Sequence, residues 1–207
     1  MKRLQRLRST QHLRNLCAET EFTTSQLIQP LFAVEGLNQN EPIMGLQAVY
    51  RQPVGLLLKQ IESDLESGVS HFLLFNVSQQ KALKGFNHTY SHSVISEIKK
   101  QFGKSLHLWV DTCLCSLTTH GHCCVFDDGH KLNHDQTLTE LSGLALNSVQ
   151  AGADGISPSD MMDGRVAKIR ATLDDALFSQ IPIMSYSTKF ASNFYGPFRQ
   201  AASSSPQ

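Results

Sequence analysis

The order of apolar and polar positions predicts strands that alternate with helices along most of the chain. Short runs that are apolar almost throughout are typical of strands covered on both faces. They occur at 27–34, 71–77, 106–110, 153–157 and 181–186. Between these runs apolar residues recur at helical spacing. The helical stripes are Val54-Leu57-Leu58-Ile61-Leu65, Val94-Ile95-Ile98, Leu141-Leu144-Val149 and Val166-Ile169-Leu173-Leu177.

Several residues predict where elements begin and end. Thr137 and Glu140 have the spacing of a capping box, which would open the helix through Leu141. Asp160 and Asp163 are predicted as turn and N-cap residues before the Val166 helix. Pro30 weakens the first predicted strand slightly, because proline cannot donate to a sheet.

Alternation of strands and helices with short connections indicates an α/β fold, with a parallel sheet and helices outside it. Five strand–helix units are compatible with a doubly wound sheet or with part of a TIM (β/α)8 barrel, which has eight strands. The pattern alone does not distinguish these two architectures.

Composition narrows the class of protein. The 207 residues are enough for one domain with a sizeable core. Lys plus Arg and Asp plus Glu both number 18, so neither nucleic acid nor an anionic membrane is expected as a partner. Residues 1–8 are basic, but no apolar segment of a signal peptide follows, and no run reaches the ~20 apolar residues that span a bilayer. We therefore predict a cytoplasmic protein.

Cysteine spacing is the strongest local signal. Four of the five cysteines fall within 113–124, directly after a predicted strand, which favours metal or redox chemistry over a disulfide framework. The thiolates of a C-x-C-x7-C pattern could hold Zn²⁺ with a fourth position open, and His122 is a reserve nitrogen ligand beside them. The alternative is a loop of reduced cysteines without a metal. The cysteines of the pattern are Cys113, Cys115 and Cys123, whereas Cys124 and Cys17 are expected to be incidental.

Two cationic residues near the end of the chain could bind a substrate, Lys189 through a carbonyl group and Arg199 through a carboxylate. Lys189 follows the last predicted strand among apolar and small residues. Desolvation there would lower its pKa and free the amine to form a Schiff base, although by itself such a lysine is more often a solvated loop residue. Arg199 could clamp a carboxylate with two hydrogen bonds, or could be a surface arginine ending a helix.

Together these segments resemble one family, porphobilinogen synthase (5-aminolevulinate dehydratase). The resemblance extends over nearly the whole chain in the order, spacing and residue identity of these segments. It is carried by QRLRSTQHLRNLCAET, LIQPLFAVEG, AVYR, DTCLC…THGHCC, GADGISPSDMMDGRVAKIRATLD and IMSYSTKFASNFYGPFRQAA.

The resemblance implies a TIM barrel whose N-terminal arm embraces a neighbouring subunit, usually within an octamer. On this basis we expect the arm at 1–24, a partial barrel at 25–200 and a disordered tail at 201–207. It also implies an enzyme of haem biosynthesis, which condenses two molecules of 5-aminolevulinate into porphobilinogen with loss of water.

The resemblance assigns roles residue by residue. By position, Lys189 matches the lysine that binds the second substrate molecule, and Arg199 matches a residue for the substrate carboxylate. Thiol ligands match the zinc-using branch of the family. The implied zinc ligands are Cys113, Cys115 and Cys123, with His122 beside them, and the polar residues of the same subsite are Asp111 and Ser159.

Departures from the family generate further expectations. The sequence stops before the last three barrel strands and before the second active-site lysine, so we expect the 207 residues alone to make no porphobilinogen. Two strand edges and the apolar interior should then lie uncovered, which favours association or aggregation. Two alternatives remain: a non-catalytic zinc-binding remnant or assembly partner of the same family, and a class I aldolase, which has no need of the cysteine loop.

Overall fold

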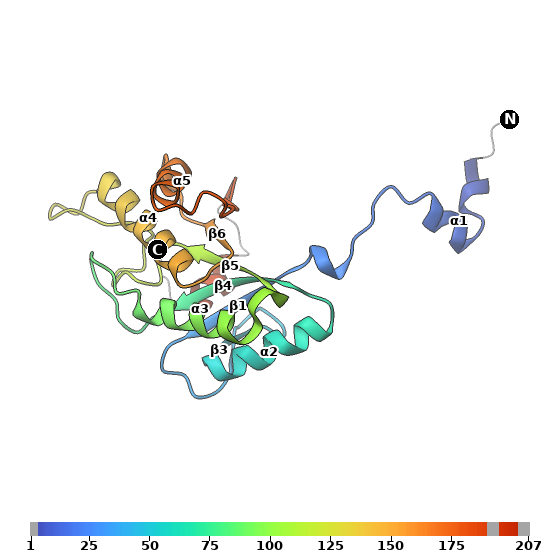
Figure 1. The fold of residues 1–207 in the computed structure, drawn as a ribbon, viewed down its shortest axis with the longest axis horizontal. Coiled ribbons are helices and arrows are strands. Elements are labelled where there is room, and N and C mark those ends of the chain that lie inside the picture. The colour runs from blue at the N-terminus through green and yellow to red at the C-terminus, as the bar shows by residue number, and fades with distance from the viewer. Residues whose placement is uncertain (1–3, 190–194, 203–207) are drawn as a thin grey trace.

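The described residues form one six-stranded sheet in the order β2-β3-β1-β4-β5-β6, and all of its strands but β2 are labelled in Figure 1. The structure, a computed structural model, describes residues 4–189 and 195–202. Neighbouring strands pair in parallel, except that β2 is antiparallel to β3. The strands are β1 (Ile28–Val34), β2 (Glu41–Pro42), β3 (Tyr50–Gln52), β4 (His71–Val77), β5 (His107–Thr112) and β6 (Gly155–Pro158).

Strand order distinguishes the two architectures that the sequence left open. The strands β1, β4, β5 and β6 lie side by side in chain order, and only the short β3, which no helix separates from β1 in the chain, lies on the other side of β1. The helices between the main strands share one core on one face, whereas a doubly wound sheet has helices on both faces. The segment 181–186 continues this order beside β6, where Met184 N donates to Ile156 O at 2.8 Å and Tyr186 N donates to Pro158 O at 3.1 Å. It pairs through an isolated bridge at Ile183 rather than as a full strand. The barrel-type α/β fold is therefore confirmed.

Helices cover one face of the sheet and create the main core. Fully buried residues of the strands, such as Leu74, Leu108 and Ile156, pack there against helical residues such as Ile61 and Ile95. The helices that contribute to this core are α2 (Val54–Glu66), α3 (Thr89–Phe102), α4 (His134–Gln150) and α5 (Arg165–Asp175), and η3 (Gly103–Ser105) follows α3.

The opposite face of the sheet is also covered in part. Successive side chains of a strand point to opposite faces, so Phe32 and Phe75 lie on the other side from Leu74. Their rings stack at 4.8 Å, and Phe198 of α6 (Tyr195–Ala201) packs on them edge-on, with its ring centroid 5.4 Å from that of Phe75. The expectation of an uncovered apolar interior is therefore wrong at this patch.

Two other expectations are corrected at the sheet edge and at the chain end. Over its carboxyl half β1 is not an open edge, because β3 pairs with it at Phe32 and Ala33. Pro30 lies beyond these pairs, where β1 is an edge strand and proline is tolerated. The predicted tail 201–207 starts too early, because Ala201 ends α6 and both Ala201 and Ala202 are buried; residues 203–207 lie outside the described residues.

The predicted capping box is wrong, because α4 begins one turn earlier. Its N-cap is Asn133, whose side chain accepts a hydrogen bond from Gln136 N at 3.0 Å. Thr137 lies in the first turn, where its hydroxyl donates to Asn133 O and accepts from Val125 N. The carboxylate of Glu140 instead accepts from Gly85 N at 3.0 Å. Both residues of the motif thus tie the helix to neighbouring loops.

The ends of α5 also differ from the prediction. Its N-cap is Gly164, which has a positive φ of 74°, and not Asp163. The helix ends at Asp175, so the exposed Leu177 lies outside it. The turn prediction for Asp160 is confirmed, because its carboxylate accepts from Met162 N at 2.8 Å.

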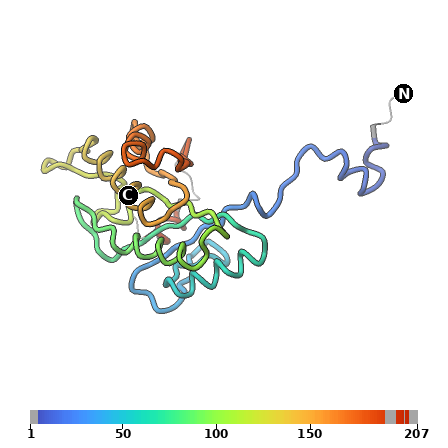
Figure 2. The backbone as a smooth tube through the Cα atoms, viewed as in Figure 1, coloured from blue at the N-terminus to red at the C-terminus, as the bar shows by residue number. Residues whose placement is uncertain are grey.

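The N-terminal segment projects away from the sheet as a long extension (Figures 1 and 2). It contains the short helices η1 (Leu4–Arg8), α1 (Gln11–Leu16) and η2 (Thr24–Gln26). Leu16 and Phe22 are 80% and 76% exposed there, so this segment buries almost nothing against its own chain. In the part of the chain that the structure describes, no helix has the length and apolar character needed to cross a membrane.

The close approach of β5 and β6 generates a stability prediction. A Cβ atom added at Gly155 would overlap Cε3 of Trp109, so Gly155→Ala must displace a packed ring. We expect the free energy of unfolding to fall by about 1–3 kcal/mol, as in other overpacked cores. The matched control is Gly143→Ala in α4, where a Cβ meets nothing within 4 Å and should stabilise the helix by about 0.5–1 kcal/mol. Urea denaturation of both variants tests this, and equal effects would contradict it.

Candidate active site and metal centre

The candidate site lies where the carboxyl ends of the parallel strands meet. β5 ends at Thr112 and is followed at once by the cysteine loop, and β6 ends at Pro158 beside it, in register with Thr112. The segment 181–186, which leads to Lys189, runs parallel to β6. Barrel enzymes build their active sites at this end of the strands.

The cysteine loop brings three thiols together. The Sγ atoms of Cys113, Cys115 and Cys123 all lie within 4.8 Å of one another, and among the described residues this is the group that could hold a metal ion. A tight turn returns the loop on itself, because Thr118 N donates to Leu114 O at 2.9 Å. Thr118 Oγ1 donates to His122 O at 2.8 Å, which fixes the backbone next to Cys123.

The electrostatics of the three thiols favour a cation. Hydrogen bonds from Cys113 and Cys115, together with the nearby charge of Lys189, lower the pKa of Cys123 to about 4. Hydrogen bonds with Cys113 and Cys123, together with burial, raise the pKa of Cys115 well above its ordinary value. The group therefore carries one thiolate that two thiols stabilise, and a bound cation would favour ionisation of all three.

Lys189 reaches the end of β6. Its Nζ donates to Ser159 O at 2.6 Å and lies 5.7 Å from the ring centroid of Tyr186. Asp111, on β5, is close enough for its charge and that of Lys189 to interact. Burial, and then the neighbouring Cys113, raise the pKa of Asp111 well above its ordinary value. The structure thus brings together Lys189, Asp111, Ser159 and the cysteine group.

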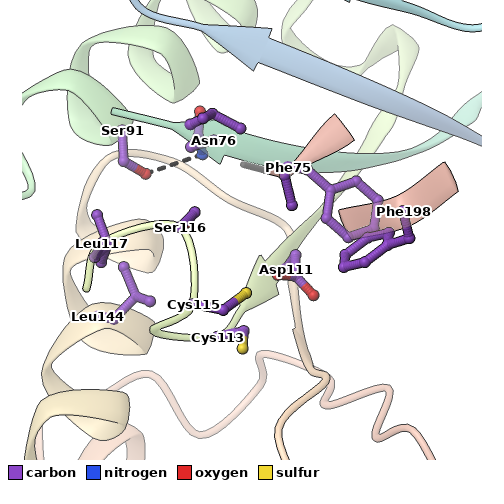
Figure 3. Close-up of a pocket in the computed structure, with 12 residues that line it drawn as sticks. Phe75, Asn76, Ser91, Asp111, Cys113, Cys115, Ser116, Leu117, Leu144 and Phe198 are labelled. Carbon is purple, nitrogen blue, oxygen red and sulfur yellow. Dashed lines mark hydrogen bonds between the residues drawn. The ribbon is translucent and has the colours of Figure 1, made fainter. Parts of the chain in front are cut away.

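A pocket opens beside these residues (Figure 3). The hollow spans about 430 Å³ of non-atom space, part of which is open solvent. Asp111, Cys113 and Cys115 line one side, and the aromatic rings of Phe75 and Phe198 line another. Space beside a carboxyl group and thiols, closed by apolar rings, suits a small polar ligand.

Two further predicted site residues adjoin the pocket and the cysteine loop along the chain. Arg199 is an exposed residue of α6, next to Phe198, which lines the pocket. The ring of His122 packs against His120 and Phe126, with centroid distances of 5.4 and 5.8 Å. The three-thiol group does not include His122.

The structure also shows an ion pair that sequence analysis missed. Arg165 Nε lies 3.4 Å from Oδ2 of Asp160, whose side chain is fully buried. The guanidinium also donates to Tyr186 O at 2.8 Å and to Ser185 Oγ at 3.3 Å. An acidic residue after a strand and an arginine at the start of the next helix could have indicated this ion pair. Hydrophobic periodicity does not detect it, because both residues are charged.

The fold and the site define a barrel-type α/β protein with a group of three cysteines that could hold a metal ion, beside a lysine. Its sequence matches the delta-aminolevulinic acid dehydratase family over residues 1–207, and the chain belongs to that family, whose members are lyases. This finding confirms the resemblance noted from the sequence.

Individual relatives agree with this assignment. The chain is 43% identical over 206 residues to a delta-aminolevulinic acid dehydratase of Ruminiclostridium josui, covering 98% of this chain and 100% of that relative. It is 41% identical to the enzyme of Halalkalibacterium halodurans and 39% identical to that of Bacillus subtilis, and aligns over 99% of its own length with each. It spans only 63% and 64%, respectively, of the length of those two relatives.

A solved structure shows the same fold. The delta-aminolevulinic acid dehydratase (porphobilinogen synthase) of Toxoplasma gondii, in complex with the reaction product porphobilinogen, superposes with a TM-score of 0.92 at 33% identity. The superposition covers 99% of this chain and 60% of that one. The arrangement of strands and helices described above is therefore that of the family.

Burial of Asp160 generates a pH prediction. Burial raises its pKa to about 6, so the folded protein binds this proton more tightly than the unfolded chain, where the value is about 3.9. The contribution of Asp160 to stability is therefore greatest below about pH 4 and is lost as the pH rises to about 6. Asp160→Asn should abolish this loss, changing the stability difference from wild type by roughly 3 kcal/mol across the window. Urea denaturation from pH 4 to 7 measures it, and parallel profiles would contradict it.

Proposed function

We propose that the protein is a porphobilinogen synthase, which condenses two molecules of 5-aminolevulinate into porphobilinogen and releases water. The observation that carries this proposal is the position of Lys189 Nζ, 2.6 Å from Ser159 O and beside the three-thiol group at the carboxyl ends of the strands. Membership of the family and the product complex of the Toxoplasma gondii relative support it.

The residues present fit a zinc ion. Thiolates are soft ligands that zinc prefers, whereas Mg²⁺ takes oxygen ligands. We propose that Cys113, Cys115 and Cys123 hold Zn²⁺, with His122 as a reserve ligand from the same loop. When bound, the ion would supply Lewis-acid polarisation of a substrate oxygen at its open position.

Lys189 would be the nucleophile. Its neutral amine attacks the keto carbon of 5-aminolevulinate and forms a carbinolamine, and loss of water from the carbinolamine gives an imine. The carbonyl of Ser159 and the ring of Tyr186 hold Nζ at the end of β6. The reacting carbon would therefore meet an amine whose position is already set, which reduces the entropy lost in the encounter.

Three further residues would bind substrate. Asp111 and Ser159 are proposed as polar contacts of the same subsite, and the raised pKa of Asp111 allows its carboxyl group to donate a hydrogen bond. Arg199 is proposed to pair with a substrate carboxylate from α6, because a guanidinium can form two parallel hydrogen bonds.

The N-terminal extension is proposed as an assembly element. Its exposed Leu16 and Phe22 would be buried against another copy of the chain, in an oligomer such as the octamer of the family. Two expectations remain predictions: a cytoplasmic location, and the absence of porphobilinogen formation by these 207 residues alone.

The metal proposal predicts zinc content. The purified chain should contain about one Zn²⁺ per molecule, as a single site requires. Replacing Cys113, Cys115 and Cys123 together by serine should remove it, because neutral hydroxyls are poor zinc ligands. Cys124→Ser, in the same loop but outside the group, and Cys17→Ser, on the exposed extension, are the matched controls and should retain zinc. Elemental analysis decides, and zinc retained by the triple variant would contradict the assignment.

The lysine proposal predicts a covalent adduct. Cyanoborohydride should trap 5-aminolevulinate on the chain, because it reduces an imine to a stable secondary amine. Mass spectrometry should place the adduct on Lys189, and Lys189→Met should lose it. Lys168→Met, at an exposed position of α5, is the control and should keep the adduct. Trapping at another lysine in the Lys189→Met variant would refute the assignment.

A further inference from the structure

Arg165 joins the two segments that determine where Lys189 lies. At the first residue of α5, its guanidinium donates to Tyr186 O at 2.8 Å and to Ser185 Oγ at 3.3 Å. These contacts hold the backbone of Tyr186 and the side chain of Ser185, three and four residues before Lys189. On its other side, Arg165 Nε lies 3.4 Å from the carboxylate of Asp160.

Asp160 connects the same guanidinium to the acceptor of the lysine. Its neighbour Ser159 provides the carbonyl to which Lys189 Nζ donates. Asp160 Oδ1 accepts from Met162 N at 2.8 Å, so the carboxylate is anchored to the turn after β6 as well as to Arg165. The pair is well shielded from water, since the side chains of Arg165 and Asp160 are 16% and 0% exposed.

We infer that Arg165 is a positioning residue, which uses its contacts with Asp160 and Tyr186 to hold the amine of Lys189 against the carbonyl of Ser159. The inference rests on the proposed role of Lys189 and assigns no contact between Arg165 and substrate. Without the guanidinium, one link between the end of β6 and the 181–186 segment is lost. The backbone pairing of Tyr186 N with Pro158 O remains, so the variant should fold with a displaced lysine.

The chain contains a matched control for this inference. Arg170, on the same helix, donates to Ile181 O at 2.7 Å and to Phe178 O at 2.9 Å and pairs with Asp174. It therefore makes the same kinds of contact as Arg165, but at the opposite end of the 181–186 segment. A purely structural role would make Arg165→Met and Arg170→Met equivalent.

The experiment compares Arg165→Met, Arg165→Lys and Arg170→Met with wild type in two assays on the full chain. The first measures cyanoborohydride trapping of 5-aminolevulinate at Lys189. The second needs no substrate: limited acetylation by acetic anhydride, with Lys168 as internal reference, measures exposure and ionisation of Lys189 from pH 6 to 10. Urea denaturation establishes that each variant is folded.

Positioning predicts that Arg165→Met lowers the trapping rate about tenfold or more. The same variant should raise the relative acetylation rate of Lys189 by about tenfold, because its ammonium group would lose the hydrogen bond to Ser159 O. Arg170→Met should leave both rates close to wild type, and Arg165→Lys should recover part of the loss by restoring a cation beside Asp160.

Two results would overturn the inference: acetylation of Lys189 that Arg165→Met leaves unchanged, or equal changes in Arg165→Met and Arg170→Met. A wild-type chain that forms no adduct at Lys189 would refute the proposed reaction instead. Acetylation would then still decide whether Arg165 positions the amine, so the two failures are distinguishable.

Discussion

The site depends on one constraint, the parallel pairing of the strands in a fixed register. Because β1, β4, β5 and β6 run in the same direction, their carboxyl ends lie along one edge of the sheet. Asp111 is in register with Ser157 across β5 and β6, so the residues that follow these positions must emerge side by side. Segments far apart in sequence thereby deliver thiols, a carbonyl and an amine to one place. A slip of one residue would turn Asp111 to the helix-covered face and dismantle the arrangement.

The charges of this edge are arranged in two layers. Nearest the pocket, the amine of Lys189 lies beside thiols and a carboxyl group whose ionisation responds to one another. Behind it, Asp160 and Arg165 form a shielded pair that touches backbone on both adjoining segments. A buried pair of this kind adds little net stability, because desolvation offsets the attraction. The main contribution of the Asp160–Arg165 pair is therefore the geometry that it imposes on the two segments.

Much of this organisation can be predicted from the sequence. The strands 71–77 and 106–110 are found because both are apolar runs, although in β5 every second position is only partly buried. The cysteine group is found because ligand spacing is local. The strands β2 and β3 are missed because they are two and three residues long and mostly polar. They form only through tertiary pairing, of β3 with β1 and of β2 with β3. The start of α4 is misplaced because Thr137, although suited to an N-cap, is recruited by the backbone of Val125.

Helix α6 and the contact of Arg165 with the backbone of Tyr186 illustrate the remaining limit. The segment around Phe198 contains glycine and proline, and its helix is stabilised by packing on Phe32 and Phe75, which only the folded sheet presents. Likewise, nothing local indicates that the guanidinium of Arg165 reaches the backbone of Tyr186, 21 residues away. Both features arise from tertiary contacts rather than from local pattern.

The close contact between Trp109 and Gly155 has an optical consequence. Trp109 is the single tryptophan of the chain, and it lies where β5 meets β6, with the ring of His107 4.5 Å away. Its indole Nε1 is buried and has no hydrogen-bond partner among the described residues. Fluorescence from this one ring therefore reports directly on the strand junction that supports the site. The protein therefore contains an intrinsic spectroscopic probe in the strand that leads into the cysteine loop, four residues before Cys113, and no added label is needed.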